Sequence, residues 1–265
     1  MANEPTPGPH PGEQGTIAVI LPVFNEGANV RAEVEAIARV LRGRRHTIIV
    51  VDDGSTDGCV TALDEAAGGA GLEIVAHGTN QGLGKAIRSG LDRAQSLPEV
   101  GTVIMKDADM TQDPAAIAPL LAALEQAGAG IAIASRYVAG STQRGVPPAR
   151  RLLSSVGNGL FRLAVRRDVR DYTCNYRAFR RATLFGPGDD RVAPLITKDG
   201  FVSSIELLLN VMARDTRVVE VPFALDYRNK IGASKMRVGR NVAECLRLLL
   251  RYVAYGRADP RGARP

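Results

Sequence analysis

The feature that most constrains the fold is a short apolar run that ends in two adjacent carboxylates. Residues 46–51 read HTIIVV, without the alternation expected of a half-exposed strand. Such a run is typical of a strand that is buried on both faces of a parallel sheet. Asp52, Asp53 and Gly54 follow directly. Ligands bind at the carboxyl ends of strands in open α/β sheets, so these carboxylates are either ligand-binding groups or caps of the next turn.

Strands and helices alternate through the first half of the chain. Besides residues 46–51, further strands are expected at residues 15–23, 72–77, 100–110 and 129–138. Helices are expected at residues 25–43, 59–67, 82–96 and 113–128. This order predicts an α/β fold with a single mainly parallel sheet flanked by helices.

The second half has a different pattern, with more arginine and longer helices. Helices are expected at residues 150–167, 199–215 and 237–257, the last of them basic and amphipathic. A turn that leads into a strand or helix is expected at residues 171–184, a strand at 216–228 and a polar loop at 229–236. We expect one domain over residues 16–256, between disordered tails at residues 1–15 and 257–265.

Composition narrows the class of partner. The chain has a net charge of +6, which suits nucleic acid, an anionic membrane or phosphorylated substrates. Only 5% of its residues are aromatic and tryptophan is absent, so single strands of nucleic acid would find few stacking surfaces, and we expect no nucleic-acid partner. The first residues do not form a secretory signal, and the three cysteines lack the spacing of metal ligands, which together favour a cytoplasmic protein. No apolar run approaches the roughly 18 residues that span a bilayer.

Two other expected strands also end in polar residues. The strand at residues 100–110 ends in Asp107 and Asp109, which are one residue apart, and the first strand leads into Asn25 and Glu26. Carboxylate oxygens are the preferred ligands of Mg²⁺ and Mn²⁺, and Mg²⁺ is often held by one or two carboxylates together with substrate phosphates. Helix capping explains each cluster of polar residues when it is taken alone. Three such clusters at one edge of a sheet favour a ligand-binding site instead.

Taken together, the motifs of the chain resemble those of a known family. The segments PVFNE, VVDDGSTD, NQGLGKAIRSG, DADM, SRYV and SK occur in the order and spacing of glycosyltransferase family 2. More narrowly, the chain resembles polyprenyl-phosphate (dolichol-phosphate) mannose or glucose synthases, from about Thr16 to Tyr252. The resemblance implies a GT-A fold, a nucleotide-sugar donor such as GDP-mannose or UDP-glucose, a polyprenyl-phosphate acceptor, and Mg²⁺ or Mn²⁺ as cofactor.

The resemblance also implies roles for individual residues. The implied donor-binding residues are Pro22, Phe24, Glu26, Asp53, Lys85, Asp107, Ala108, Ser234 and Lys235. The implied metal ligands are Asp107 and Asp109. The implied contacts to the acceptor phosphate are Arg136, Arg150, Arg151 and Arg228, because guanidinium groups stay charged and bind phosphate oxygens in pairs. Asp109, Arg136 and Asp199 are the candidate catalytic residues.

The implied reaction is an inverting sugar transfer. A lipid phosphate is already an anion and needs no general base, whereas an alcohol needs one, usually a carboxylate. Asp199 would be that base if the acceptor is instead a soluble small molecule, the second hypothesis. A non-catalytic binding module is the third. The chain departs from the synthases in having Thr111 before Gln112 and CNY at residues 174–176.

Membrane contact, if present, would be peripheral. Residues 240–257 could provide it as a basic amphipathic surface at the cytoplasmic face of the membrane. A helix packed on the core is the commoner structure for such a segment.

Overall fold

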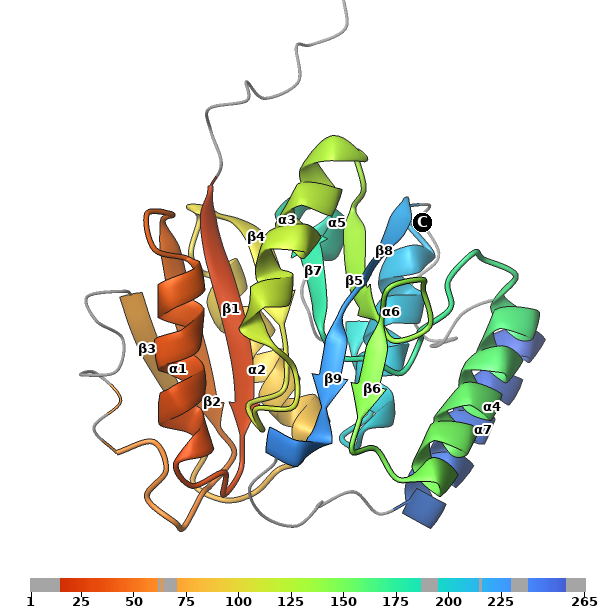
Figure 1. Ribbon diagram of the computed structural model, residues 1–265, viewed down its shortest axis with the longest axis horizontal. Coiled ribbons are helices and arrows are strands. Elements are labelled where there is room, and N and C mark those ends of the chain that lie inside the picture. Colours follow the sequence, from red (N-terminus) through yellow and green to blue (C-terminus); the bar gives the residue numbers. More distant parts are fainter. Residues whose placement is uncertain are drawn as a thin grey trace, which may run out of the picture.

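The protein is described here by a computed structural model, which covers residues 15–61, 63, 71–186, 195–214, 216–229 and 238–255. Its centre is a seven-stranded sheet in the order β3-β2-β1-β4-β7-β5-β8 (Figure 1). The strands are β1 (Thr16–Val23), β2 (His46–Asp52), β3 (Gly71–Ala76), β4 (Val100–Met105), β5 (Ile131–Ser135), β7 (Arg177–Arg180) and β8 (Val218–Pro222). All neighbouring strands pair in parallel except β7, which is antiparallel to β4 and β5.

Helices cover both faces of this sheet because successive residues of each strand point to opposite faces. Val19 and Leu21 of β1 belong to the core beneath α1 (Asn29–Val40) and α3 (Ile117–Gln126), which a short helix η1 (Pro114–Ala116) precedes. Ala18 and Ile20 belong to the core on the other face. That face is covered by α2 (Leu83–Gln95), α4 (Pro148–Val165), α5 (Arg181–Phe185), α6 (Val202–Met212) and α7 (Val238–Tyr255). The expected α/β fold with a mainly parallel sheet is confirmed.

Several expected elements differ in detail. Residues 59–61 of the helix expected at 59–67 form a turn, and most of the remainder lies outside the described residues. The helix expected from residue 25 begins at Asn29, because Asn25 and Gly27 have positive φ angles of 51° and 55°, which an α-helix cannot contain.

The strand expected at residues 216–228 divides into two. β8 ends at Pro222, and β9 (Ala224–Asp226) pairs with β6 (Thr142–Arg144) in a second, two-stranded sheet. Proline lacks the N–H that would continue the ladder, so a break at this position has a local cause. A short helix, η3 (Tyr227–Asn229), follows β9.

The two long helices of the second half, α4 and α7, lie side by side at one end of the sheet (Figure 1). Throughout the described part of the chain, every helix is too short or too polar to cross a membrane. The tails expected at residues 1–15 and 257–265 lie, apart from Gly15, outside the described residues, as does nearly all of the polar loop expected at 229–236.

Candidate active site

The loops that follow β1 and β2 are joined to each other at the carboxyl edge of the sheet. The backbone N–H of Asn25 donates to Oγ of Ser55 at 3.0 Å, and Asn25 Oδ1 accepts from the backbone N–H of Thr56 at 2.8 Å. Asp57 accepts from the backbone N–H of Gly27 at 2.9 Å. Pro22, Phe24 and Glu26 are partly buried beside this junction. The two loops therefore form one continuous wall.

The two adjacent carboxylates at the end of β2, Asp52 and Asp53, have different hydrogen-bond partners. Asp52 accepts from the backbone N–H of Ser55 at 2.9 Å, which is the turn-capping role. Asp53 is buried and accepts from the backbone N–H groups of Gln81 and Gly82 at 2.9 and 2.8 Å, and it is 2.7 Å from Nδ1 of His77. Asp53 therefore ties the end of β2 to the start of α2.

The carboxylates after β4 are held in place by neighbouring side chains. Both groups of the Gln112 amide engage Asp107, whose Oδ2 accepts at 2.8 Å and whose backbone N–H donates at 2.9 Å. Asn175 donates to Asp107 Oδ1 at 3.2 Å. Thr111 donates to Asp109 Oδ1 through its hydroxyl at 2.6 Å and its backbone N–H at 3.2 Å. Thr111, Gln112 and Asn175, where the chain departs from the synthases, therefore all orient the two carboxylates.

An ion pair lies directly beneath these carboxylates. Lys106 and Glu33 of α1 are both fully buried and bonded to each other, and Lys106 also donates to the carbonyl oxygen of Asp107 at 3.2 Å. Burial raises the pKa of Glu33 and lowers the pKa of Lys106, in each case against the attraction of the partner. The pair joins α1 to the backbone that carries Asp107.

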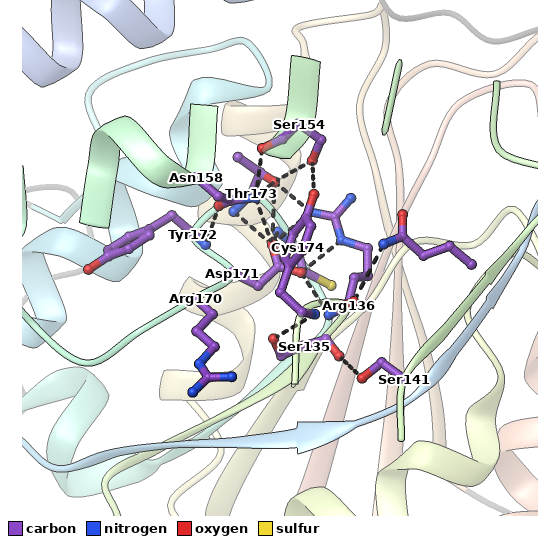
Figure 2. A network of polar contacts seen from close by, with 12 residues as sticks. Ser135, Arg136, Ser141, Ser154, Asn158, Arg170, Asp171, Tyr172, Thr173 and Cys174 are labelled. Carbon is purple, nitrogen blue, oxygen red and sulfur yellow. Dashed lines mark hydrogen bonds and ion pairs between the residues drawn. The ribbon is translucent and has the colours of Figure 1, made fainter. Parts of the chain in front are cut away.

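Arg136, directly after β5, is paired with Asp171 in a network of polar contacts (Figure 2). Nε and Nη2 of Arg136 each donate to one carboxylate oxygen of Asp171 at 2.7 Å, and Nη2 also donates to Thr173 at 2.5 Å. Within the described part of the chain, Nη1 of Arg136 has no hydrogen-bond partner. Burial alone would lower the pKa of Arg136 and raise that of Asp171, but their mutual attraction outweighs it in both cases.

Helix α4 contributes the outer part of the same network (Figure 2). Asn158 donates to Thr173 at 3.1 Å and accepts from the backbone N–H of Tyr172 at 2.7 Å. Ser154 accepts from the hydroxyl of Tyr137 at 2.9 Å. The orientation of Arg136 is therefore fixed from both the sheet and α4.

A cavity of about 380 Å³ joins these groups to the space between α4 and α7. Asp107, Asp109 and Arg136 line it at the sheet edge, and Arg150 lines it from the start of α4. Its walls are mainly apolar: Leu153, Val156, Leu160, Phe161, Phe201, Leu225, Val242, Leu246 and Leu249. The arrangement suits a ligand with an anionic group and a long apolar part.

Of the remaining arginines and lysines of the expected site that the structure describes, Arg150 lines the cavity and the others do not. Arg150 also donates to the Tyr227 hydroxyl at 3.1 Å. Arg151 is exposed and does not line the cavity. Arg228 is exposed and bonded to Asp226, whose pKa falls to about 2 because of that hydrogen bond.

The other expected donor-binding residues differ in exposure. Lys85 is exposed at the start of α2, whereas Ala108 is buried between the two carboxylates. Ser234 and Lys235 lie outside the described residues.

Asp199, the candidate base, is not among the residues that line the cavity, and it forms an ion pair. It accepts from Arg88 of α2 at 2.6 Å, and its side chain is 67% exposed. Its segment is anchored by Glu206, which accepts from the backbone N–H groups of Thr197 and Lys198 at 2.8 and 2.9 Å. The segment also touches Gly84, where an added Cβ would overlap the Lys198 carbonyl oxygen. The geometry therefore makes Asp199 part of the contact between α2 and this segment.

Sequence analysis missed several of these residues. The burial of Glu33 in an ion pair could have been predicted, because a charged residue on the apolar face of an expected helix needs a buried partner. Asn158 lies likewise on the inner face of α4. Gln112 and Asn175 were marked only by their departure from the synthase pattern. The contact of Asn175 with Asp107 depends on where β7 enters the sheet, whereas that of Gln112 forms within the loop after β4.

The residues at the sheet edge fit a divalent cation. In the part of the chain that the structure describes, no three His, Cys, Asp or Glu side chains are grouped as ligands. Asp107 and Asp109 supply two carboxylates among oxygen and amide neighbours, the donor set that hard cations prefer, and Mg²⁺ commonly completes its shell with water and substrate phosphates. Two carboxylates would leave most of the coordination shell of such a cation to water or to oxygen atoms of a ligand.

The fold and the site together define a GT-A glycosyltransferase, with a mainly parallel sheet that carries paired carboxylates at its carboxyl edge. The sequence profile of the family described as glycosyl transferase family 2 matches residues 18–185. The chain is also 34% identical to polyprenol monophosphomannose synthase of Mycolicibacterium smegmatis, over 91% of this chain and 88% of the relative. The chain therefore belongs to glycosyltransferase family 2.

One further relative and two solved structures are also similar to this chain. The chain is 29% identical to dolichol-phosphate mannosyltransferase of Pyrococcus furiosus, over 90% of this chain and 64% of the relative. Glucosyl-3-phosphoglycerate synthase of Mycobacterium tuberculosis, solved with UDP, superimposes with a TM-score of 0.65 and 21% identity, over 97% of this chain and 88% of that one. The same enzyme was solved with Mn²⁺ and UDP, with a TM-score of 0.63, 19% identity, and coverage of 97% and 88%. At this identity the solved structures support the fold alone.

Proposed function

We propose that this glycosyltransferase transfers mannose or glucose, with inversion, from a nucleotide sugar to a polyprenyl phosphate at the cytoplasmic face of a membrane. The observation that carries the proposal is the cavity, which has carboxylates and arginines at one end and an apolar wall along α4 and α7. A lipid phosphate combines a charged group with an apolar chain in this way, whereas a small soluble acceptor would leave most of the apolar wall without a contact.

Asp107 and Asp109 would hold the divalent metal together with the donor's diphosphate. The metal would supply charge neutralisation for the departing nucleoside diphosphate. Pro22, Phe24 and Glu26 would form the wall against the nucleoside, and Asp53 would support it through the start of α2. These roles agree with the loops that the structure joins at the sheet edge.

Arg136 and Arg150 would bind the acceptor phosphate, because both line the cavity. A phosphate oxygen would attack the anomeric carbon from the face opposite the diphosphate. The new carbon–oxygen bond would form as the bond to the diphosphate breaks, and the diphosphate would leave with the electron pair. The phosphate needs no deprotonation at neutral pH, so the reaction needs no general base, which agrees with the ion pair that engages Asp199. Arg151 and Arg228 remain predictions outside the cavity.

The relatives favour mannose as the first donor sugar to test. The names of two of them, from Mycolicibacterium smegmatis and Pyrococcus furiosus, specify mannose transfer or synthesis. The nucleotide base would be recognised by contacts at the β1 and β2 loops, and the motifs there do not distinguish guanine from uracil. GDP-mannose and UDP-glucose are therefore both substrates to be compared.

The deciding experiment measures the release of nucleoside diphosphate from GDP-mannose and from UDP-glucose, with Mn²⁺ or Mg²⁺, with and without a short polyprenyl phosphate. We expect release to depend on the lipid with one donor, and to be lost in Asp109→Asn. Asp199→Asn should retain lipid-dependent release, because a phosphate acceptor needs no base. Lipid-independent release with either donor, or loss of transfer in Asp199→Asn, would support a soluble alcohol acceptor instead.

A further inference from the structure

A fully buried arginine, Arg177, lies in the core behind the candidate site. It is the first residue of β7, and it is 0% exposed. In the sheet it stands between Met105 of β4 and Ile133 of β5, which both belong to the apolar core that α2 and α6 cover. Arginine is almost never fully buried unless it is paired, so its presence here needs a physical reason.

The side chain of Arg177 has no carboxylate partner among the residues that the structure describes. Its Nε atom is also buried without a hydrogen-bond partner there. Burial lowers the pKa of Arg177 to about 10, so the side chain keeps its charge at neutral pH. A buried charge without an ion pair costs stability. Packing of the core therefore does not explain why an arginine stands at this position.

The two hydrogen bonds of this arginine show what it holds. Nη2 donates to the carbonyl oxygen of Tyr172 at 2.7 Å, and Nη1 donates to the carbonyl oxygen of Ser204 in the first turn of α6. Tyr172 belongs to residues 171–176, which we call the pre-β7 loop. The backbone N–H of Tyr172 donates in turn to Asn158 of α4. The peptide groups of Tyr172 are therefore held from both α6 and α4.

The first part of the pre-β7 loop contacts Arg136. Nη2 of Arg136 donates to Asp171 at 2.7 Å and to Thr173 at 2.5 Å (Figure 2). These two residues stand on either side of Tyr172, whose carbonyl oxygen Arg177 holds. A displacement of Tyr172 would therefore displace both partners of Arg136.

The last part of the pre-β7 loop contacts Asp107. Asn175, two residues before Arg177, donates to Asp107 at 3.2 Å. Asn175 is buried, and in the described part of the chain its Oδ1 atom has no hydrogen-bond partner. Its contact with Asp107 therefore depends on where the backbone places it. One loop thus contacts both the carboxylate proposed for the metal and the arginine proposed for the acceptor phosphate.

We propose that Arg177 is a positioning residue for the transfer reaction, which fixes the pre-β7 loop so that Asp107 and Arg136 keep the separation that the reaction needs. Arg177 does not line the cavity, so it acts through the loop. An arginine suits this role because its planar fork can donate to two carbonyl groups at once, whereas lysine carries its donors on a single nitrogen. The catalytic part of the proposal rests on the proposed function; the hold on the loop does not.

Steady-state kinetics of Arg177→Met tests the proposal, with Arg180→Met as the matched control. Arg180 is also in β7 and also donates to two backbone carbonyl groups, those of Leu124 and Ala129, but it does not contact the pre-β7 loop. Arg177→Met should lower kcat for lipid-dependent transfer about 10²-fold, because a displacement of about 1 Å can cost that much. The KM values should change much less, since the binding side chains all remain. Arg180→Met should keep the kcat of the wild type.

Alkylation of Cys174 tests the hold on the loop without any substrate. Cys174 lies within the pre-β7 loop and is 4% exposed, and burial raises the pKa of its thiol to about 12, so it should react slowly while the loop keeps its place. Cys59, buried in the loop that follows β2, is the internal reference. Labelling with iodoacetamide is followed for each peptide by mass spectrometry.

We expect Arg177→Met to speed the labelling of Cys174 relative to Cys59 at least about tenfold, because a hydrogen bond from a charged group is worth that factor or more in an opening equilibrium. Arg180→Met should leave the ratio unchanged. An unchanged ratio in Arg177→Met would overturn the hold of this arginine on the loop.

Arg177→Lys is the second variant, and it decides the question if Arg177→Met does not fold. It keeps a charge in the core but loses the fork, so it should show the same loss of kcat and the same faster labelling. Wild-type kcat in Arg177→Lys would overturn the proposal. A loss of transfer that only follows the fraction of folded protein, measured by circular dichroism, would overturn it as well.

The two proposals fail separately. Faster labelling of Cys174 in Arg177→Met, when the wild type shows no lipid-dependent transfer, would count against the proposed function alone. Lipid-dependent transfer by the wild type, with the same kcat in both Arg177 variants, would count against the role of Arg177 alone.

Discussion

Arg136 and Asp171 are 35 residues apart in the chain and form a two-pronged ion pair, with both nitrogen–oxygen distances at 2.7 Å. Asp171 is fully buried, and the Arg136 side chain remains slightly exposed at the cavity. A planar guanidinium held by two parallel hydrogen bonds has little freedom to rotate. Asp171 is therefore a positioning residue for the group that we propose binds the acceptor phosphate.

Asp171→Asn should reduce kcat for transfer to the lipid phosphate by about 10²-fold, because a small displacement of a reacting group can cost that much. The KM for the nucleotide sugar should change little, since the donor side of the site is built from other loops. Steady-state kinetics with each substrate varied in turn measures the split. Equal loss of donor binding and turnover, with a proportionate loss of folded protein, would reduce Asp171 to a structural role.

The same substitution should alter acid stability. Attraction to Arg136 outweighs the effect of burial and holds the pKa of Asp171 below its usual value. The pair therefore contributes stability above the pKa of an unfolded aspartate, about 3.9, and this contribution is lost as pH falls through the lower folded pKa. At pH 7, Asp171→Asn should lower the free energy of unfolding by about 3 kcal/mol. Urea unfolding at pH 7 and in strong acid measures this difference, which should shrink in acid; a constant difference would exclude the ionic explanation.

Asp109→Asn should abolish most metal-dependent turnover, at a cost of about 10²-fold or more, because the charge on the departing diphosphate would be less well neutralised. Affinity for nucleoside diphosphate should become insensitive to added Mn²⁺, which calorimetry can measure without any turnover. Asp113→Asn is a suitable control, because Asp113 is nearby and exposed and caps Ala115. Equal effects of the two substitutions would remove Asp109 from the metal site.

The buried Glu33–Lys106 pair should show strong coupling between its members. Lys106→Met should cost about 3–5 kcal/mol, because it leaves a buried carboxylate without its partner. Glu33→Leu combined with Lys106→Met should cost much less, since well-packed apolar residues often replace a buried ion pair without loss. Chemical unfolding of the two single variants and the double variant measures the coupling free energy. Additive losses would mean that the pair does not act as a unit.

The contact between α2 and the 195–199 segment gives a fifth prediction. Gly84→Ala should lower the free energy of unfolding by about 1–3 kcal/mol, because the new methyl group would overlap backbone atoms of Lys198 and Asp199. Gly159→Ala in α4 meets no atom within 4 Å and should stabilise the protein by up to about 1 kcal/mol. Thermal or urea unfolding compares the two. Equal effects would show that the close approach is relieved by movement of the segment.

The parts of the site that local pattern could predict are those that follow a parallel strand. Asp53, Asp107 and Asp109 each lie within four residues of the end of an apolar run, and the strand order β2-β1-β4 brings them to one edge, as the pattern indicated. The fold class followed from the same alternation. Neither inference needed information about distant parts of the chain.

The parts that could not be predicted depend on β7. The pattern at residues 171–184 fitted a strand or a helix, and nothing local showed that β7 would enter between β4 and β5 in the opposite direction. The contacts of Asn175 with Asp107 and of Asp171 with Arg136 follow from that insertion. The ion pair of Asp199 could not be predicted for a related reason, because its partner Arg88 is 111 residues away.

The reversed direction of β7 has a consequence for how such a site can change. The loop that precedes β7, rather than the loop that follows it, faces the cavity, so α4 and this loop form a cassette inserted between β6 and a strand whose register is fixed by its neighbours. Changes of length or composition within the cassette would reshape the proposed acceptor side without moving the β1, β2 and β4 loops at the other half of the sheet edge. Under the proposed function, exchange of this segment between related chains is therefore a practical route to new acceptors with the proposed donor-binding loops unchanged.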